Sequence, residues 1–267
     1  MMTLVSEPVV GDGAMERDLL VEEARRAQAL AEQALNLRDE FVSIAAHELK
    51  TPVASLKLCA QMLERRMSKG SAKPEDVTRG LRTIREQSDR LGRLIDGLLD
   101  ISRLQAKRFM LDVCRTDVVS LAGSVCSLMT PLLGEHTVEF EAPESLWADV
   151  DPLRVEQIIV NLLTNAAKFT VGPRPIQLKI AEEGSTVAIS VRDFGLGIPQ
   201  EARDTLFNRF HQAHSAKHHG GMGLGLYISR EIAEAHGGTL EAEHPPDGGA
   251  KFVLRLPLSS RPDEAAG

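Results

Sequence analysis

The first quarter of the chain has the hydrophobic spacing of one long helix. From about residue 15 to residue 67, Ala, Leu, Glu, Gln and Arg dominate and Pro52 is the only proline. This composition favours a helix, and its length of more than fifty residues is typical of a coiled coil. Apolar positions recur alternately after four and three residues, at Val42, Ala46, Leu49, Val53, Leu56, Ala60, Leu63 and Met67. This pattern predicts a heptad seam.

A second seam lies upstream and is out of phase with the first. Its members are Leu30, Ala34, Leu37, Phe41 and Ile44. The two seams meet just before His47, and a phase break of this kind locally changes the winding of a coiled coil. It is either a packing detail or a joint that transmits a signal. Pro52 is predicted to remove a helical hydrogen bond and to kink the helix one turn after His47.

A second amphipathic helix follows a turn. Residues 68–73 include Gly70 and predict the turn, and Pro74 suits the first turn of the next helix. The apolar seam of that helix is Val77, Leu81, Ile84, Ser88, Leu91, Ile95, Leu98 and Ser102. Two antiparallel helices cannot bury such faces alone, so we expect a homodimer that forms a four-helix bundle.

After about residue 107 the pattern changes to short strands that alternate with helices. Strands are predicted at 109–113, 137–142, 176–181, 187–192, 239–244 and 251–256, and helices near 118–133, 152–169 and 224–235. The mixture predicts an α/β sandwich, in which one sheet packs against a layer of helices. The predicted division is a flexible lead (1–14), a coiled-coil helix (15–40), a helical hairpin (41–106), an α/β domain (107–260) and a polar tail (261–267).

Composition narrows the possible partners and location. The 267 residues favour about two domains, and 31 basic against 38 acidic residues give a net charge of −7. This charge argues against nucleic acid or an anionic membrane as the main partner. The three cysteines have no metal-ligand spacing, which indicates reduced thiols in a cytoplasmic protein. We expect no direct membrane insertion, because no apolar run approaches the roughly 18 residues of a membrane span and the first residues do not resemble a signal peptide.

His47 is the first candidate for chemistry. Its neighbours Ala46 and Leu49 belong to the seam, so the imidazole is predicted to face solvent. Glu48 could accept the hydrogen of one ring nitrogen and make the other more nucleophilic. Thr51, one helical turn later, could place a hydroxyl beside the ring. A surface histidine alone is ordinarily without function, but these companions favour a reactive one.

A helix over residues 151–170 carries two amides on one face. Asn161 and Asn165 are four residues apart, and Lys168 follows closely. Amide oxygens can complete the octahedral shell of Mg²⁺, and a lysine can contact phosphate as a point charge. An ordinary polar helix face is the alternative explanation of the pair.

Two glycine-rich stretches follow. In DFGLGIP (193–199), Gly195 and Gly197 permit close backbone approach by a ligand, and Asp193 could accept a hydrogen bond from the exocyclic amine of adenine. Taken in isolation, this stretch is better explained as an ordinary turn. GGMGLGL (220–226) is the stronger signal, because it runs directly into a helix whose N-terminus can bind an anion. It lacks the lysine of a P-loop and does not follow a strand, which excludes Walker and Rossmann sites.

A lid is predicted between the two glycine stretches. Phe207 and Phe210 could anchor one end of a polar segment that reaches Gly221 and closes over a nucleotide. The histidines of this segment are His211, His214, His218 and His219. We interpret them as a solvated face rather than a metal site, since no cysteine or carboxylate completes a zinc set.

Taken together, these motifs resemble the sensor histidine kinases of two-component systems. HELKTPV (47–53) is similar to the family's H box, with Lys50 where arginine is commoner, and NLLTNAAKFT (161–170) to its N box. DFGLG, LFNRF and GMGLGL resemble the first glycine box, the F box and the second glycine box. The resemblance extends from about residue 38 to residue 258. It implies a dimerisation and phosphotransfer hairpin followed by a Bergerat-type ATP-binding domain.

The resemblance also implies the role of each motif residue. His47 would take the γ-phosphoryl group of ATP, Glu48 would orient or deprotonate the imidazole, and Thr51 would position a water when a phosphorylated partner is dephosphorylated. The nucleotide would be held by Asn165 (through Mg²⁺), Asn161, Lys168, Asp193, Gly195, Gly197, Phe207, Phe210, Gly221, Gly223, Leu224, Gly225 and Leu226. The implied partner is the receiver domain of a response regulator, which receives the phosphoryl group on an aspartate.

Departures from the family pattern are few. Asn208 stands where an acidic residue is frequent in the F box, which leaves the behaviour of the lid open. No membrane span, sensor domain or receiver domain is recognisable, so we expect either a separate sensor protein that acts through the N-terminal coiled coil or an excised core. Two rivals remain: a non-catalytic coiled-coil adaptor, against which the intact Asn and Gly motifs argue, and an ATPase of the chaperone or topoisomerase kind, against which the H box argues.

Overall fold

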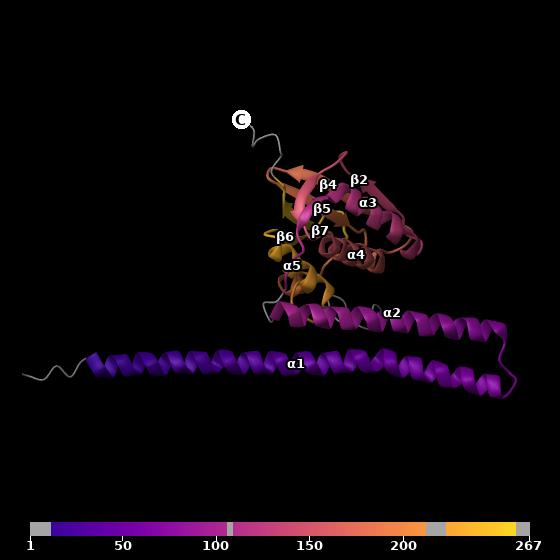
Figure 1. Ribbon diagram of the computed structural model, residues 1–267, viewed down its shortest axis with the longest axis horizontal. Helices are drawn as coiled ribbons and strands as arrows, with labels where there is room; N and C mark the ends of the chain where they lie inside the picture. The colour runs from indigo at the N-terminus through magenta and orange to yellow at the C-terminus, as the bar shows by residue number, and fades with distance from the viewer. Residues whose placement is uncertain (1–11, 106–108, 212–222, 260–267) are drawn as a thin grey trace, which may run out of the picture. The chain divides into compact units, whose positions relative to one another are not determined.

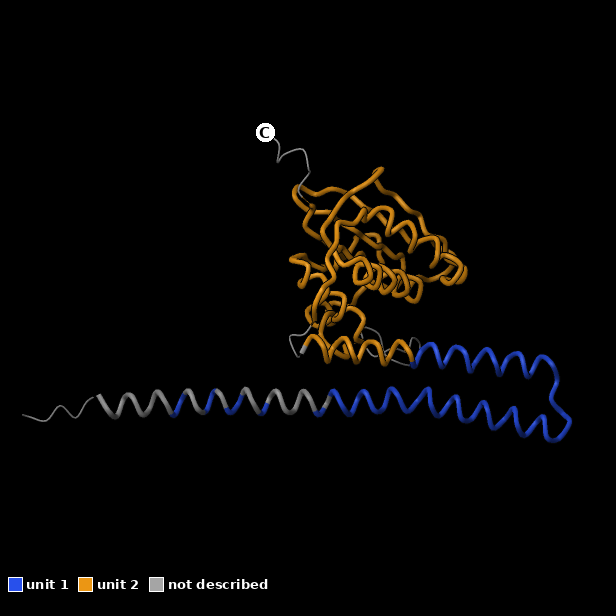
Figure 2. Tube along the Cα trace, in the orientation of Figure 1, with its two compact units in different colours: residues 1–91 blue, residues 92–267 orange. Residues whose placement is uncertain are grey.

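The computed structural model describes residues 12–105, 109–211 and 223–259 (Figure 1). The chain divides into two compact units, residues 1–91 and residues 92–267 (Figure 2). In the described part of the chain, no helix combines the length and the apolarity needed to cross a membrane. The predicted lead and polar tail lie almost wholly outside the described residues.

Both long helices predicted from the heptad spacing are present. α1 spans Asp12–Ser68 and α2 spans Pro74–Gln105. α1 is continuous through Pro52, and its C-terminal part changes direction in Figure 1. The side chains of Leu30, Ala34 and Leu37 lie outside the described residues, so the phase break before His47 stays a prediction.

Specific contacts fix the antiparallel register of the hairpin. The thiol of Cys59 donates to the carbonyl of Gly80 over 3.4 Å. Near the turn, Arg66 pairs with Asp76 across 2.7 Å, and this hydrogen bond lowers the pKa of the Asp76 carboxyl. The turn itself is closed by backbone bonds from Gly70 to Met67 and from Ser71 to Arg66, with Gly70 at φ +60°.

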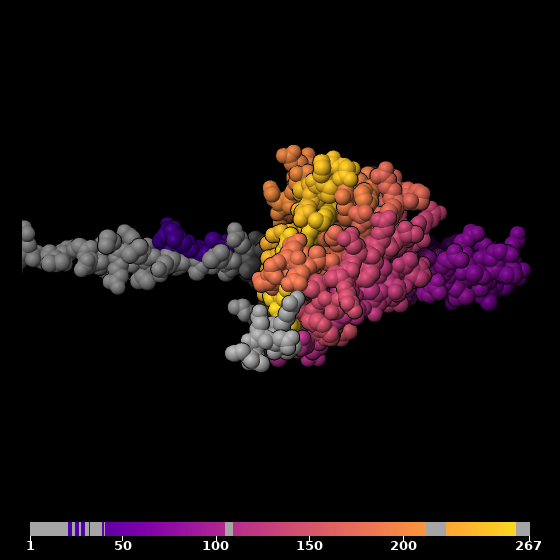
Figure 3. Space-filling view, turned by 90° about the horizontal axis from the view of Figure 1, so that it is seen from above, coloured from indigo at the N-terminus to yellow at the C-terminus, as the bar shows by residue number. Residues whose placement is uncertain are grey.

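The second unit contains a five-stranded sheet. The strands are β2 (Val138–Glu141), β4 (Ile176–Glu183), β5 (Thr186–Arg192), β6 (Thr239–Glu243) and β7 (Lys251–Pro257). Their order is β2-β4-β5-β7-β6, with β2 parallel to β4 and the other pairs antiparallel. β7 lies beside β5 in the sheet, and in the space-filling view yellow residues near the C-terminal end of the colour bar lie beside orange residues near position 200 (Figure 3).

Three helices pack on this sheet and complete the core. They are α3 (Val118–Met129), α4 (Pro152–Phe169) and α5 (Gly225–Ala235). Two short 3-10 helices, η1 (Thr130–Leu132) and η2 (Gln200–Thr205), lie between other elements. Apolar side chains of α4 such as Ile158 and Leu163 are fully buried, as are Leu178 of β4 and Ile189 of β5. The structure therefore confirms the predicted fold class, a helical hairpin followed by an α/β sandwich.

The strand predictions need two corrections. Residues 109–113 form no strand; the strand β1 (Cys114–Asp117) begins just after them and pairs with β3 (Trp147–Val150), which the spacing did not predict. Both strands have only four residues and leave one face exposed, so their hydrophobic signal is weak. The ring of Phe109, whose apolar character suggested a strand, instead lies 4.7 Å from the guanidinium of Arg154.

A buried polar cluster joins the last turns of α2 to α4 within the second unit. Asp100 is only 4% exposed. Its two carboxylate oxygens accept hydrogen bonds from Arg154 Nη1 at 2.9 Å and from Gln157 Nε2 at 2.8 Å. Arg154 Nη1 also donates to Gln157 Oε1 at 2.8 Å, which closes the triangle.

Replacing Asp100 with alanine should destabilise the second unit strongly. The change leaves Arg154 without its carboxylate, and breaking a buried ion pair from one side costs roughly 3 kcal/mol or more. Chemical denaturation should show this loss in the free energy of unfolding. Asp96→Ala on the exposed side of the same helix is the matched control, with an expected change within about 0.5 kcal/mol. Equal effects of the two substitutions would contradict a structural role of the cluster.

Candidate functional site

His47 lies on the exposed surface of α1, as predicted, but its companions point elsewhere. The carboxylate of Glu48 accepts a hydrogen bond from Arg90 Nη2 of α2 at 3.2 Å. The hydroxyl of Thr51 donates to the main-chain carbonyl of His47 at 3.1 Å. Consecutive residues are rotated by about 100° around a helix, so Glu48 faces α2 while the imidazole faces solvent. The predicted contacts of both side chains with the ring are therefore not made in this conformation.

The helix that carries the two asparagines begins at a firm cap. Asp151 Oδ1 accepts from the N–H groups of Leu153 and Arg154 at 3.1 and 3.2 Å, and Pro152 occupies the first turn. The N–H of Asp151 donates to His236 Nε2 over 3.0 Å. His236 therefore ties the start of α4 to the end of α5, a contact that sequence reasoning missed because the two residues are 85 positions apart.

Asn161 and Asn165 lie on one face of α4, as their spacing predicted. Asn165 Nδ2 donates to Asn161 Oδ1 at 3.4 Å. Asn161 Nδ2 donates in turn to the hydroxyl of Ser229 in α5 at 3.0 Å. A Cβ atom at Gly225 would overlap Oδ1 of Asn161, so the glycine at the start of α5 makes room for this amide. Lys168 is close by, with its Nζ atom 4.8 Å from the centroid of the Phe169 ring.

Asp193 lies at the end of β5 and is only 4% exposed. Its Oδ1 atom accepts from the N–H groups of Gly195 and Ala250, at 2.9 and 3.2 Å. A Cβ atom at Gly195 would overlap the carbonyl of Phe169, the last residue of α4. Gly195 therefore lets the turn after β5 approach the helix of the asparagines. Gly197 follows with φ +68°.

The aromatic residues of the LFNRF segment contact the domain core. Phe207 packs edge-to-face on Phe252 of β7 with ring centroids 6.5 Å apart, and Phe210 has φ +63°. Arg209 donates to the hydroxyl of Tyr227 over 2.7 Å and stacks on its ring. Burial raises the pKa of the Tyr227 phenol, so the ring stays neutral at pH 7. These contacts hold one end of the predicted lid against α5 and β7.

Most of the predicted lid lies outside the described residues, including Gly221, His214, His218 and His219. His211 is described, and its Nε2 atom lies 3.4 Å from the hydroxyl of Thr205. Among the described residues, no cluster of three histidine, cysteine or acidic side chains could hold a metal ion.

The second glycine stretch leads directly into α5. Gly223 has φ +67°, and Leu224 is the N-cap residue of the helix, followed by Gly225 and Leu226. A leucine side chain has no acceptor, so the first N–H groups of α5 receive no side-chain cap. Such a helix start favours a bound anion. The domain thus combines a helix start without a side-chain cap, a pair of amides and a buried carboxylate.

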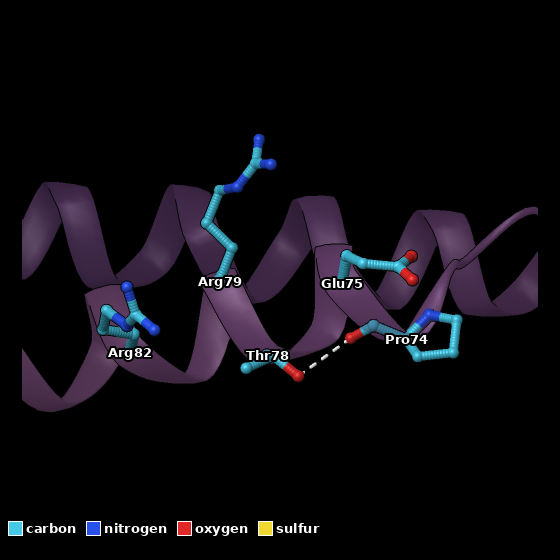
Figure 4. Close-up of a pocket in the computed structure, with 5 residues that line it drawn as sticks. All are labelled: Pro74, Glu75, Thr78, Arg79 and Arg82. Carbon is cyan, nitrogen blue, oxygen red and sulfur yellow. Dashed lines mark hydrogen bonds between the residues drawn. The ribbon is translucent and has the colours of Figure 1, made fainter.

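A shallow hollow of about 360 Å³ occurs elsewhere, at the start of α2. It is lined by Pro74, Glu75, Thr78, Arg79 and Arg82 (Figure 4). Thr78 donates to the carbonyl of Pro74 over 2.9 Å, which is ordinary first-turn geometry. The hollow contains none of the motif residues, so we do not regard it as the functional site.

Comparison with known proteins agrees with this arrangement. Residues 37–107 match the His Kinase A (phospho-acceptor) domain, and residues 150–260 match the family described as histidine kinase-, DNA gyrase B-, and HSP90-like ATPase. The chain is 32% identical over 237 residues to the signal transduction histidine-protein kinase AfsQ2 of Streptomyces coelicolor, which covers 85% of this chain and 43% of that protein. It is 34% identical over 262 residues to the sensor histidine kinase MtrB of Mycobacterium bovis, covering 94% of this chain and 45% of MtrB. The chain thus spans less than half the length of these relatives.

Solved structures support the fold. The Acinetobacter baumannii histidine kinase AdeS superposes with a TM-score of 0.63 at 22% identity, over 80% of this chain and 98% of that one. Full-length ShkA in complex with AMPPNP superposes with a TM-score of 0.58 at 24% identity, over 84% of this chain and 46% of that one.

Proposed function

We propose that this chain, a member of the sensor histidine kinases of two-component systems, is an ATP-dependent protein-histidine kinase. Its phosphoryl acceptor is His47. The observation that supports this most is the pairing of an exposed histidine on a helical hairpin with a domain in which Asn161, Asn165 and the start of α5 converge. Phosphohistidine would then donate the phosphoryl group to an aspartate in the receiver domain of a response regulator.

The residues of the α/β domain fit a nucleotide and its metal ion. Mg²⁺, when bound, neutralises charge on the transferring phosphate. The amide oxygen of Asn165 would hold the ion, and Asn161 and Lys168 would contact the phosphates. Asp193 would accept a hydrogen bond from the exocyclic amine of adenine through Oδ2, because its Oδ1 atom already receives the N–H groups of Gly195 and Ala250.

Phosphoryl transfer from ATP requires a nucleophile and a base from the hairpin. A nitrogen of the His47 ring attacks the γ-phosphorus, the bond from that phosphorus to the bridging oxygen breaks, and ADP leaves. The attacking nitrogen uses its lone pair, and the hydrogen on the second ring nitrogen passes to a base, a role we assign to Glu48. Since that carboxylate is bound to Arg90 in the structure, Glu48 must exchange this partner for the imidazole before it can act.

The exposed apolar side chains of the hairpin indicate a protein partner. Large apolar side chains on the hairpin stay exposed in a single chain, among them Val53, Leu58, Met67 and Leu81. We propose that a second copy covers them in a four-helix bundle. A separate sensor protein could act through the N-terminal part of α1. Because the reaction consumes ATP, we place these domains in the cytoplasm.

Incubation with γ-labelled ATP and Mg²⁺ tests the proposal directly. A phosphoryl group on histidine is stable to base and labile to acid, whereas serine and threonine phosphates survive acid. We expect base-stable, acid-labile label on the protein that a receiver domain can remove. Acid-stable label, or no label under conditions where ATP binds, would overturn the proposed activity.

Thr51→Ala should separate the two activities of the hairpin. The hydroxyl of Thr51 lies at the His47 carbonyl and can accept a hydrogen bond from a water, but attack by the imidazole itself requires no water. We expect dephosphorylation of the regulator to fall about a hundredfold, as for loss of a positioning group, with autophosphorylation nearly unchanged. Time courses of labelled regulator and labelled kinase measure the two rates. Thr51→Ser keeps the hydroxyl and should restore dephosphorylation; equal losses of both rates in Thr51→Ala would contradict this division.

A further inference from the structure

A chain of hydrogen bonds runs from α5 to the proposed metal ligand. Ser229 is 2% exposed, and its hydroxyl accepts from Asn161 Nδ2 at 3.0 Å. Asn161 Oδ1 then accepts from Asn165 Nδ2 at 3.4 Å. The nitrogen of each amide therefore points along the hydrogen-bond chain toward Ser229. This order leaves the carbonyl oxygen of Asn165 at the end of the hydrogen-bond chain that is farthest from Ser229.

This order matters because the two ends of a primary amide have opposite chemistry. The oxygen of Asn165 can bind a cation, whereas its NH₂ group would repel one. If Asn161 turned over, its NH₂ group would face the NH₂ group of Asn165, and Asn165 would also have to turn. The orientation of Asn161 thus decides which atom of Asn165 faces the metal ion.

Ser229 and Gly225, both in α5, hold the amide of Asn161 in place. On one side the amide lies against Gly225, where even a Cβ atom would overlap Oδ1. On the other side the Ser229 hydroxyl supplies the acceptor for Nδ2. Ser229 is one helical turn after Gly225 in α5, so the two residues present the same face of that helix to Asn161.

We propose that Ser229 is a positioning residue for Mg²⁺: its hydroxyl holds the amide of Asn161 in place, and Asn161 in turn presents the carbonyl oxygen of Asn165 to the ion. The inference rests on the proposed function, in which Asn165 holds the metal, and adds to it a residue that touches neither metal nor nucleotide. Partners that orient a metal ligand commonly contribute ten- to a hundredfold to metal affinity.

The test is nucleotide binding with and without the metal. Calorimetric titration of ADP gives its dissociation constant in EDTA and at a series of Mg²⁺ concentrations. Ser229→Ala should leave the dissociation constant of ADP in EDTA unchanged. It should raise about tenfold the Mg²⁺ concentration at which half of the metal-dependent change in ADP affinity is reached. The KM for Mg²⁺-ATP in autophosphorylation should rise with it.

A matched control separates positioning from general damage. Ser190 in β5 is also buried, and its hydroxyl donates to the carbonyl of Lys179 over 3.3 Å rather than bonding to either amide of the pair. Ser190→Ala removes the same group and should not alter the Mg²⁺ dependence. Ser229→Cys, which keeps a weak acceptor in nearly the same volume, should give an intermediate effect and serves if Ser229→Ala does not fold.

The outcomes are distinguishable. A Ser229→Ala protein with unchanged Mg²⁺ dependence, or with the same loss of ADP affinity in EDTA as in Mg²⁺, overturns the positioning role. A wild-type protein whose ADP affinity does not respond to Mg²⁺ instead overturns the metal site of the proposed function.

Discussion

Replacing His47 with glutamine should abolish the acid-labile label completely. Glutamine keeps the polarity and roughly the length of histidine and is a good helix former, so the exposed surface of α1 is preserved. A surface change of this kind alters stability by no more than about 0.5 kcal/mol. ADP affinity should therefore match that of the wild type while phosphoryl transfer is lost.

Two described histidines of the α/β domain, His236 and His136, already use ring nitrogens in hydrogen bonds. Both ring nitrogens of His236 are engaged, Nδ1 with the carbonyl of Ile232 at 2.7 Å and Nε2 with the N–H of Asp151 at 3.0 Å. His136 has its Nδ1 atom 3.2 Å from the carbonyl of Arg174. His136→Gln is accordingly the control and should keep full labelling. Acid-labile label that persists in His47→Gln would assign the acceptor to another residue.

The fold was predictable from sequence to the extent that local patterns determine it. Heptad spacing predicts α1 and α2, because an apolar stripe repeats over many turns. The position predicted for β1 is wrong, and β3 is not predicted at all. Four residues with one exposed face give almost no periodic signal. Motif residues such as Asn161 and Asn165 could be assigned to one face of a helix because their spacing is local.

What the sequence could not predict depends on contacts between distant positions. Glu48 was expected beside the imidazole, yet its partner is Arg90, 42 residues further along. Ser229 lies in a predicted helix, but its spacing carries no functional signal, because its contact with Asn161 joins positions 68 residues apart. Neither partner has a local signature, so side-chain orientation at the site follows from how the helices pack.

Asp193→Asn should weaken ADP binding about a hundredfold, or roughly 2.7 kcal/mol. The reason is the fixed orientation of the buried side chain. Oδ1 of Asp193 receives the N–H groups of Gly195 and Ala250, and an asparagine can satisfy both donors only with its own oxygen in that place. Its NH₂ group would then point to the position proposed for the exocyclic amine of adenine, and donor would face donor.

The same geometry predicts a change of base preference that a merely damaged site would not show. Inosine diphosphate presents a carbonyl oxygen where adenine presents its amine, so the NH₂ group introduced by Asp193→Asn can donate to it. Wild-type protein should prefer ADP, and the variant should prefer inosine diphosphate, as measured by calorimetric titration of both nucleotides. Equal losses for both would show that the substitution disturbs the turn after β5 rather than base recognition. A reversed preference would instead assign Asp193 to the exocyclic group of the base, because the loss of one negative charge alone does not exchange the preference between a donor and an acceptor at that group.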